Sequence, residues 1–177
     1  MKEVYLLTGR PGTGKTSLIK QAISGLHIKA GGFYTEEIRT GGIRCGFRIV
    51  TLDGEEGILA HIDIQSPYRV GKYGVDIEKF EQVGVVSIER AAMESHLVVI
   101  DEIGKMELLS PRFKEVVLKI ISSGRMILGT IMLAPHPWAD SLKEHPQVNL
   151  VSITRANHQE VLQDLRGWLE SSCGGAL

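Results

Sequence analysis

Several features that mark other protein classes are scarce in this chain of 177 residues. It has two cysteines, Cys45 and Cys173, without metal-ligand spacing, so we expect packing or surface roles in a reducing, cytoplasmic compartment. No apolar run approaches the ~20 residues that span a membrane, and the apolar stretch 4–7 is too short for a signal peptide. No segment is strongly basic and the formal net charge is -1, which argues against a dedicated nucleic-acid binder.

What is present is an ordinary globular composition, with 43% hydrophobic and 23% charged residues. The length predicts one domain, 1–177, able to bury a core around one sheet. Apolar patterning predicts strands over 3–7, 31–38, 97–100, 126–133 and 148–153. It predicts helices over 15–24, 87–95, about 111–123, 139–145 and from about 157, before a frayed tail at 171–177.

The order of these elements predicts an α/β fold with a doubly wound, mostly parallel sheet flanked by helices. Residues 43–52 and 57–62 flank the turn-rich segment 53–57, which predicts an antiparallel β-hairpin added to that sheet. Residues 71–82 read as a loop running into a short helix. The pair Ser110–Pro111 predicts a helix start, because serine caps free amides and proline suits the first helical position.

The strongest motif lies between the first strand and the first helix. The sequence GRPGTGKT at 9–16 fits G-x-x-x-x-G-K-[ST] without a mismatch. Glycines let the backbone amides turn inward around phosphate oxygens, and the helix N-terminus adds its positive end. Lys15 is expected to bridge the β- and γ-phosphates, and the Thr16 hydroxyl to ligate Mg²⁺. The predicted phosphate-binding residues are Gly9, Arg10, Pro11, Gly12, Thr13, Gly14, Lys15, Thr16 and Ser17.

A second motif is the acid pair that ends the buried run 97–100. The carboxyl ends of parallel strands line the ligand crevice, so Asp101 is expected to hold Mg²⁺ together with Thr16. Glu102 is placed to activate the attacking water, which favours hydrolysis; the alternatives are a surface glutamate or an ion-pair partner of Lys105. The same segment matches the D-x-x-G of GTPases, but no N-K-x-D follows, so recognition of guanine alone is unsupported.

Other candidates are weaker. Thr130, near the end of a strand, could touch the γ-phosphate or the water, or could be an ordinary strand residue. Lys105, Arg39 and Arg48 are candidates for a positive group at the γ-phosphate, or they are solvated or paired with acids. Phe33 and Tyr73 are candidates for stacking on a base; the alternative is that both rings simply pack in the protein interior.

Five segments in order carry a family resemblance: GRPGTGKTSL, GGFYTEEIR, GFRIVTLDG, GKYGVDIEKFE and VVIDEIGKMELLS. Together they resemble the small P-loop nucleoside-triphosphatases that include the cancer-related and thermophile enzymes. The resemblance implies a P-loop NTPase fold and Mg²⁺-dependent hydrolysis of ATP, GTP, CTP, UTP and TTP. It departs at the last helix, where Asn157-His158 replaces the Asn-Arg of many members.

Carried onto this sequence, the resemblance implies a second group of nucleotide-binding residues around the acids: Val98, Val99, Ile100, Asp101, Glu102, Ile103, Gly104 and Lys105. The predicted catalytic residues are then Lys15, Glu102, Lys105 and Thr130, in a protein expected to be monomeric. Two alternatives stay open, a nucleotide or small-molecule kinase and a slow nucleotide-dependent switch. A kinase usually needs an arginine-rich lid, and LAPHPWADSLKEHP at 133–146 contains no arginine.

Overall fold

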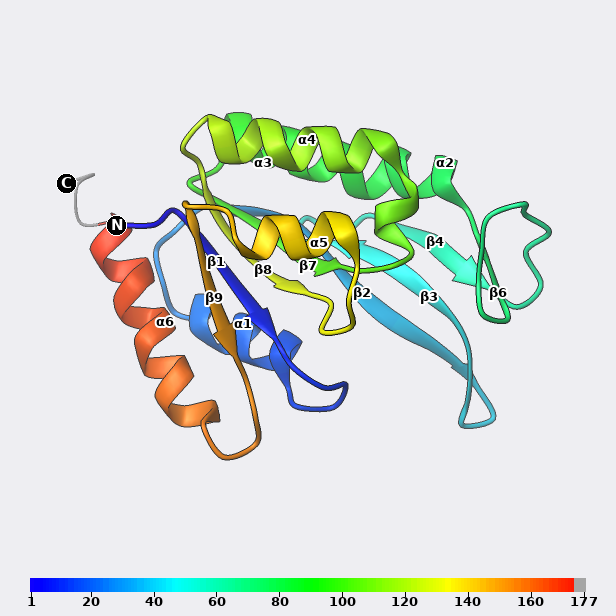
Figure 1. Cartoon of the computed structure of the whole chain (residues 1–177), viewed down its shortest axis with the longest axis horizontal. Helices are drawn as coiled ribbons and strands as arrows, with labels where there is room; N and C mark the ends of the chain where they lie inside the picture. Colours follow the sequence, from blue (N-terminus) through cyan, green and yellow to red (C-terminus); the bar gives the residue numbers. More distant parts are fainter. Residues whose placement is uncertain (174–177) are drawn as a thin grey trace.

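A mixed β-sheet forms the centre of the computed structural model, which describes residues 1–173 (Figure 1). Within these residues nine strands lie in the order β5-β6-β4-β3-β2-β7-β8-β1-β9. Their bounds are β1 Val4–Thr8, β2 Ala30–Thr40, β3 Ile43–Thr51, β4 Glu56–His61, β5 Arg69–Val70, β6 Tyr73–Val75, β7 Leu97–Ile103, β8 Met126–Ile131 and β9 Val148–Ser152.

Helices connect β1 to β2, β6 to β7, β7 to β8 and β8 to β9, and one more helix follows β9. The α-helices are α1 Lys15–Ile23, α2 Ile77–Phe80, α3 Val86–Glu94, α4 Pro111–Ser122, α5 Pro137–Lys143 and α6 His158–Cys173. A π-helical turn, η1 Glu81–Val85, joins α2 to α3, and a 3₁₀ turn, η2 Glu107–Leu109, precedes α4. Within the described part of the chain, no helix is long and apolar enough to cross a membrane.

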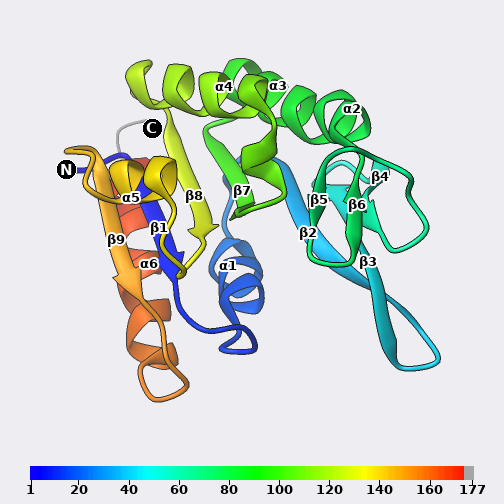
Figure 2. The same cartoon turned by 45° about the vertical axis from the view of Figure 1, so that its right-hand side comes forward.

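The sheet has a parallel and an antiparallel half. Strands β2, β7, β8, β1 and β9 pair in parallel, which confirms the predicted α/β fold. Strand β2 also pairs antiparallel with β3, and β3 with β4, so the predicted hairpin is confirmed (Figure 2). The expectation of a plain loop at the start of 71–82 is wrong, because β6 pairs with β4 and buries Tyr73 and Val75.

Two apolar layers hold the helices on opposite faces of the sheet (Figure 1). On one face, α1 and α6 pack through Leu18, Ile19 and Leu165. On the other, α2 to α5 pack over a cluster that includes Phe33, Phe80 and Phe113, whose ring centroids lie 5.2–6.4 Å apart. Each helix therefore covers the sheet with one apolar side, as its sequence pattern predicts.

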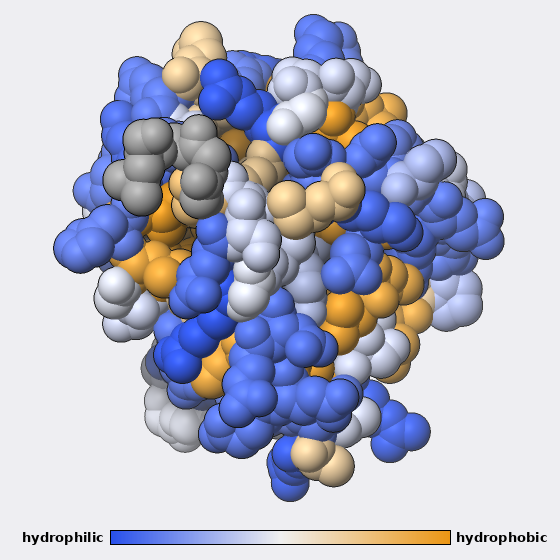
Figure 3. Space-filling model, turned by 90° about the vertical axis from the view of Figure 1, so that its left-hand side faces the viewer, coloured by the Kyte–Doolittle hydropathy of each residue, from blue (hydrophilic) through white to orange (hydrophobic). Residues whose placement is uncertain are grey.

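Helix ends follow local chemistry in α4. The Ser110 hydroxyl accepts a hydrogen bond from the Phe113 amide at 3.0 Å, Pro111 opens the helix, and Gly124 follows its end with φ 72°. The expected frayed tail is partly wrong, because α6 continues to Cys173, while 174–177 lie outside the described residues. The end of the molecule that carries α6 and β9 presents a mostly hydrophilic surface interrupted by apolar areas (Figure 3).

Candidate functional site

The glycine-rich loop connects β1 to α1 and ends at the helix cap Gly14. This residue has a left-handed backbone with φ 83° and no side chain, so the amides of the first helical turn stay available to an anion. The Lys15 ammonium turns back over the loop and donates to the carbonyls of Gly9 and Arg10, at 2.9 and 3.0 Å. The Thr13 hydroxyl donates to the same Arg10 carbonyl at 2.8 Å. These contacts fold the loop into a compact ring.

Asp101 joins the loop to two neighbouring strands. Its Oδ2 accepts a hydrogen bond from the Thr16 hydroxyl at 2.5 Å, and its Oδ1 accepts one from the buried Thr130 hydroxyl at 2.6 Å. The side chain is only 4% exposed, and burial raises its pKa, against the opposing effect of the two threonine hydrogen bonds. Thr130 therefore contacts the acid directly.

Glu102 lies next to this acid and is only partly buried. The peptide bond between Asp101 and Glu102 is cis. Burial raises the pKa of Glu102, the neighbouring Asp101 raises it further, and the positive charge of Lys15 lowers it. Within residues 1–173 its carboxylate takes part in no ion pair, so the predicted alternative of a pair with Lys105 is not formed.

The aliphatic part of the second predicted group lies underneath the acids. Val98, Val99, Ile100 and Ile103 are at most 1% exposed and belong to the two core clusters. They fix the end of β7 from below, and a nucleotide at the surface would not reach their side chains. Gly104 is also buried, whereas Ser17 and Lys105 are exposed.

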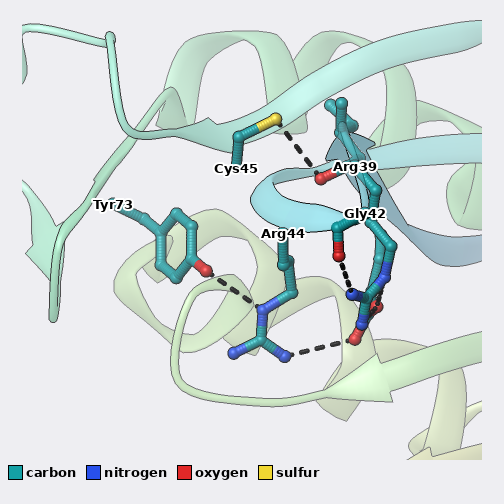
Figure 4. A network of polar contacts seen from close by, with 7 residues as sticks. Arg39, Gly42, Arg44, Cys45 and Tyr73 are labelled. Carbon is teal, nitrogen blue, oxygen red and sulfur yellow. Dashed lines mark hydrogen bonds and ion pairs between the residues drawn. The ribbon is translucent and has the colours of Figure 1, made fainter.

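The other two candidates for a positive group at the γ-phosphate, Arg39 and Arg48, form ion pairs with glutamates of the β2–β3 hairpin. Arg39 lies 2.7 Å from Glu37, and Arg48 lies 3.1 Å from Glu36. Figure 4 shows the network around the tip of this hairpin, in which Arg44 donates to the Tyr73 hydroxyl at 3.0 Å.

The aromatic candidates are packed into the protein. Phe33 is fully buried and Tyr73 is 7% exposed, so both serve packing here rather than present a face for a base.

Two residues near the site carry no clear signal in the sequence pattern. Glu107 stands in the short turn η2, and its buried carboxyl lies near that of Glu102. His158 begins α6, and its Nε2 lies 3.3 Å from the point that a β-carbon on Gly14 would occupy. The only sequence signal at His158 is the departure from the family's arginine.

A short hydrogen-bonded turn fixes His158 against the loop. The Asn157 carboxamide accepts from the Thr154 amide at 2.8 Å and donates to the Ser152 carbonyl at 2.9 Å. The Ile153 amide donates to the Thr8 carbonyl at 2.8 Å, which ties the same segment to the end of β1. The segment 152–158 therefore lies directly beside the glycine-rich loop.

The donor set at Asp101 fits a hard divalent cation. The Thr16 hydroxyl and the Asp101 carboxylate are both oxygen donors, and they meet at the loop. Asp101 has no ion-pair partner among the described residues, and a buried carboxylate without one favours a bound cation. In residues 1–173 no group of three or more His, Cys, Asp or Glu residues could hold a metal, so such a cation would take its remaining ligands from water and phosphate.

A phosphate loop between a buried strand and a helix, with an acid at the end of a neighbouring parallel strand, defines a P-loop NTPase. A family model described as NTPase matches residues 4–166, and the chain belongs to this family. A nucleoside-triphosphatase THEP1 of Thermotoga sp. is 50% identical, covering 96% of this chain and 97% of the relative. The human cancer-related nucleoside-triphosphatase is 38% identical, covering 97% and 99%.

Solved structures agree with this assignment. The crystal structure of THEP1 from Aquifex aeolicus superposes with a TM-score of 0.86 at 36% identity, covering 94% of this chain and 99% of that one. The solution structure of the human cancer-related enzyme superposes with a TM-score of 0.79 at 37% identity, covering 97% and 99%. The fold and the family predicted from the sequence are therefore confirmed.

Proposed function

We propose that this protein is a Mg²⁺-dependent nucleoside-triphosphate hydrolase in which Glu102 activates the attacking water. Membership of the NTPase family supports hydrolysis of nucleoside triphosphates in general. The observation that carries the finer proposal is the position of Glu102. It follows Asp101 directly and is only partly buried; burial and Asp101 raise its pKa, which suits a proton acceptor, while the charge of Lys15 acts in the opposite direction.

The phosphate chain is bound by the loop Gly9–Thr16, with Ser17 continuing the first helical turn. Amides of the loop and of the first turn of α1 are proposed to donate to phosphate oxygens, since no side chain caps that helix end. The Lys15 ammonium exchanges its two carbonyl acceptors, 2.9 and 3.0 Å away, for β- and γ-phosphate oxygens. Lys105, exposed beyond the acids, is proposed to add positive charge near the γ-phosphate.

Thr16 and Asp101 would hold the Mg²⁺, since their oxygens already lie 2.5 Å apart. When bound, the ion neutralises charge on the β- and γ-phosphates. Thr130 acts through Asp101, because its hydroxyl donates to the other carboxylate oxygen and fixes its orientation. The three side chains thus form one connected unit.

In the hydrolytic step, Glu102 accepts a proton from a water molecule as the water oxygen bonds to the γ-phosphorus. The bond from that phosphorus to the bridging oxygen breaks, and the nucleoside diphosphate leaves with the electron pair. The base is expected to matter little, so ATP, GTP, CTP, UTP and TTP are all proposed substrates. The breadth is what the family resemblance implies, and the sequence has no N-K-x-D motif for recognising guanine alone.

A panel of the five triphosphates with Mg²⁺, followed by phosphate release without any acceptor, tests the proposal. Glu102→Gln is expected to lower kcat by about a hundredfold or more, because the general base is lost. Glu115→Gln, at an exposed acid of α4, is the matched control and should match the parent. Parent-like turnover by Glu102→Gln would contradict the assigned base. Phosphate transfer only to an added acceptor would indicate a kinase, and tight binding with negligible turnover a switch.

A further inference from the structure

The carboxyl group of Glu107 is buried, and no positively charged side chain of residues 1–173 pairs with it. The side chain is 4% exposed, and no ion pair within residues 1–173 includes it. Its side-chain partner is the Thr35 hydroxyl, 3.4 Å from Oε1, which is a weak contact. A buried and unpaired carboxylate is costly, so such a group takes up a proton.

The surroundings of Glu107 explain why its carboxyl takes up a proton. Burial raises its pKa to about 8, with Glu102 and then Asp101 contributing, while the backbone amides of Gly104 and Glu107 act in the opposite direction. The helices α2 and α4 also pack against this turn, and they contribute the apolar Phe80 and Phe113 to the cluster that holds Leu108. The largest charges that bear on Glu107 are Glu102 and Asp101, both negative and both on β7. From the neighbouring turn η1, the Glu81 carboxylate accepts a hydrogen bond from the Ser110 hydroxyl at 2.7 Å.

The turn at Gly104 brings Glu107 beside Glu102. A β-carbon on Gly104 would lie 2.6 Å from Glu102 Oε1 and 3.0 Å from Glu107 Oε2. Two oxygens, one from each carboxyl, thus approach the same point. The Leu108 amide donates to the Gly104 carbonyl at 2.9 Å and closes the turn, which keeps the two side chains on one side of it.

We propose that Glu107 is a positioning residue for Glu102, and that its neutral carboxyl faces Glu102 as a hydrogen-bond donor. This leaves Glu102 as the single negative charge of the pair and holds its carboxylate toward the nucleotide. Ionisation of Glu107 would place a second negative charge against Glu102 and remove the donor. The inference rests on the proposed role of Glu102 as the base.

Two substitutions separate this role from a merely structural one. Glu107→Gln keeps a neutral hydrogen-bond donor of the same length, and it is expected to retain kcat for ATP within about threefold. Glu107→Met keeps the length but removes the donor, and it is expected to lower kcat by about ten- to a hundredfold, the usual cost of a hydrogen bond to a charged group. KM should change less than about twofold in both, because the phosphate loop is untouched.

The pH profile is a second readout, which also serves if Glu107→Met fails to fold. The parent's kcat/KM, which reports ionisations of the free enzyme, is expected to fall as pH rises through about 8, where Glu107 loses its proton. Glu107→Gln should lack this fall. A parent-like Glu107→Met, a loss in Glu107→Gln as large as in Glu107→Met, or a pH profile unchanged in Glu107→Gln would each overturn the inference.

The failure of this inference and of the proposed function are distinguishable. If Glu102→Gln hydrolyses ATP like the parent, the base assignment itself is wrong. If Glu102→Gln is inactive while Glu107→Met turns over normally, only the positioning role of Glu107 fails. Thermal unfolding and binding of a non-hydrolysable ATP analogue to each variant provide the check that fold and binding are intact.

Discussion

Glu107→Gln is expected to stabilise the folded protein, and increasingly so as pH rises. The pKa of Glu107 is about 8 in the folded state against an ordinary value of 4.5, so the folded chain keeps a proton that the unfolded chain releases. Stability contributed by this group is therefore complete below pH 4.5 and is lost as pH rises toward 8. At pH 7 the loss is about 3 kcal/mol, at about 1.36 kcal/mol per pH unit above the unfolded value.

Urea unfolding at pH 5, 6, 7 and 8, without nucleotide or Mg²⁺, measures this effect. The difference in free energy of unfolding between Glu107→Gln and the parent should grow by about 3 kcal/mol across that range. The amide of glutamine adds an offset that does not vary with pH, so the slope is the decisive quantity. Asp101 and Glu102 are present in both proteins, so their contributions to the pH dependence largely cancel in the difference between the two free energies of unfolding. A difference that stays constant with pH would refute the reasoning.

Three further outcomes test the rest of the site. Lys15→Ala should lower kcat/KM for every triphosphate by about a hundredfold or more in a phosphate-release assay, and retained activity would contradict the whole site. Thr130→Val should lower the free energy of unfolding by about 2 kcal/mol in urea and reduce kcat, whereas Thr130→Ser, which keeps the hydroxyl, should keep kcat and lose only about 1 kcal/mol for its buried methyl group. His158→Ala should weaken binding of a fluorescent triphosphate analogue by about fivefold, because its ring borders the loop at Gly14, while the exposed His96→Ala should leave binding unchanged. If the two histidine variants bind the analogue with equal affinity, His158 does not contribute to nucleotide binding.

Much of the fold could be predicted because its signals are local. The parallel core follows from short apolar runs alternating with amphipathic helices, and the Ser110–Pro111 start of α4 from capping chemistry. The pairing of β6 could not be predicted in this way. Its three residues read as loop, and they become a strand because β4 offers a partner and the core accepts Tyr73 and Val75.

In the candidate site, too, local features could be predicted from the sequence and contacts between distant segments could not. The phosphate loop is one continuous segment, so the residue types alone indicate its backbone and its ligand class. Thr130 was a weak candidate, because nothing in a strand sequence reveals which neighbour its hydroxyl meets. The hydrogen bond to Asp101 at 2.6 Å exists since β7 and β8 lie side by side.

The sequence by itself determined the class of chemistry, through the loop Gly9–Thr16 and the acids Asp101 and Glu102. The loop is one continuous motif typical of phosphate binding, and an acid at the end of a buried strand predicts a divalent cation beside it. Only the tertiary structure decided which other groups bear on those residues. The buried carboxyl of Glu107 and that of Glu102 approach the same point at Gly104, and His158 borders Gly14 although it lies far along the sequence. Such contacts depend on burial and on packing between distant segments, which no local pattern encodes.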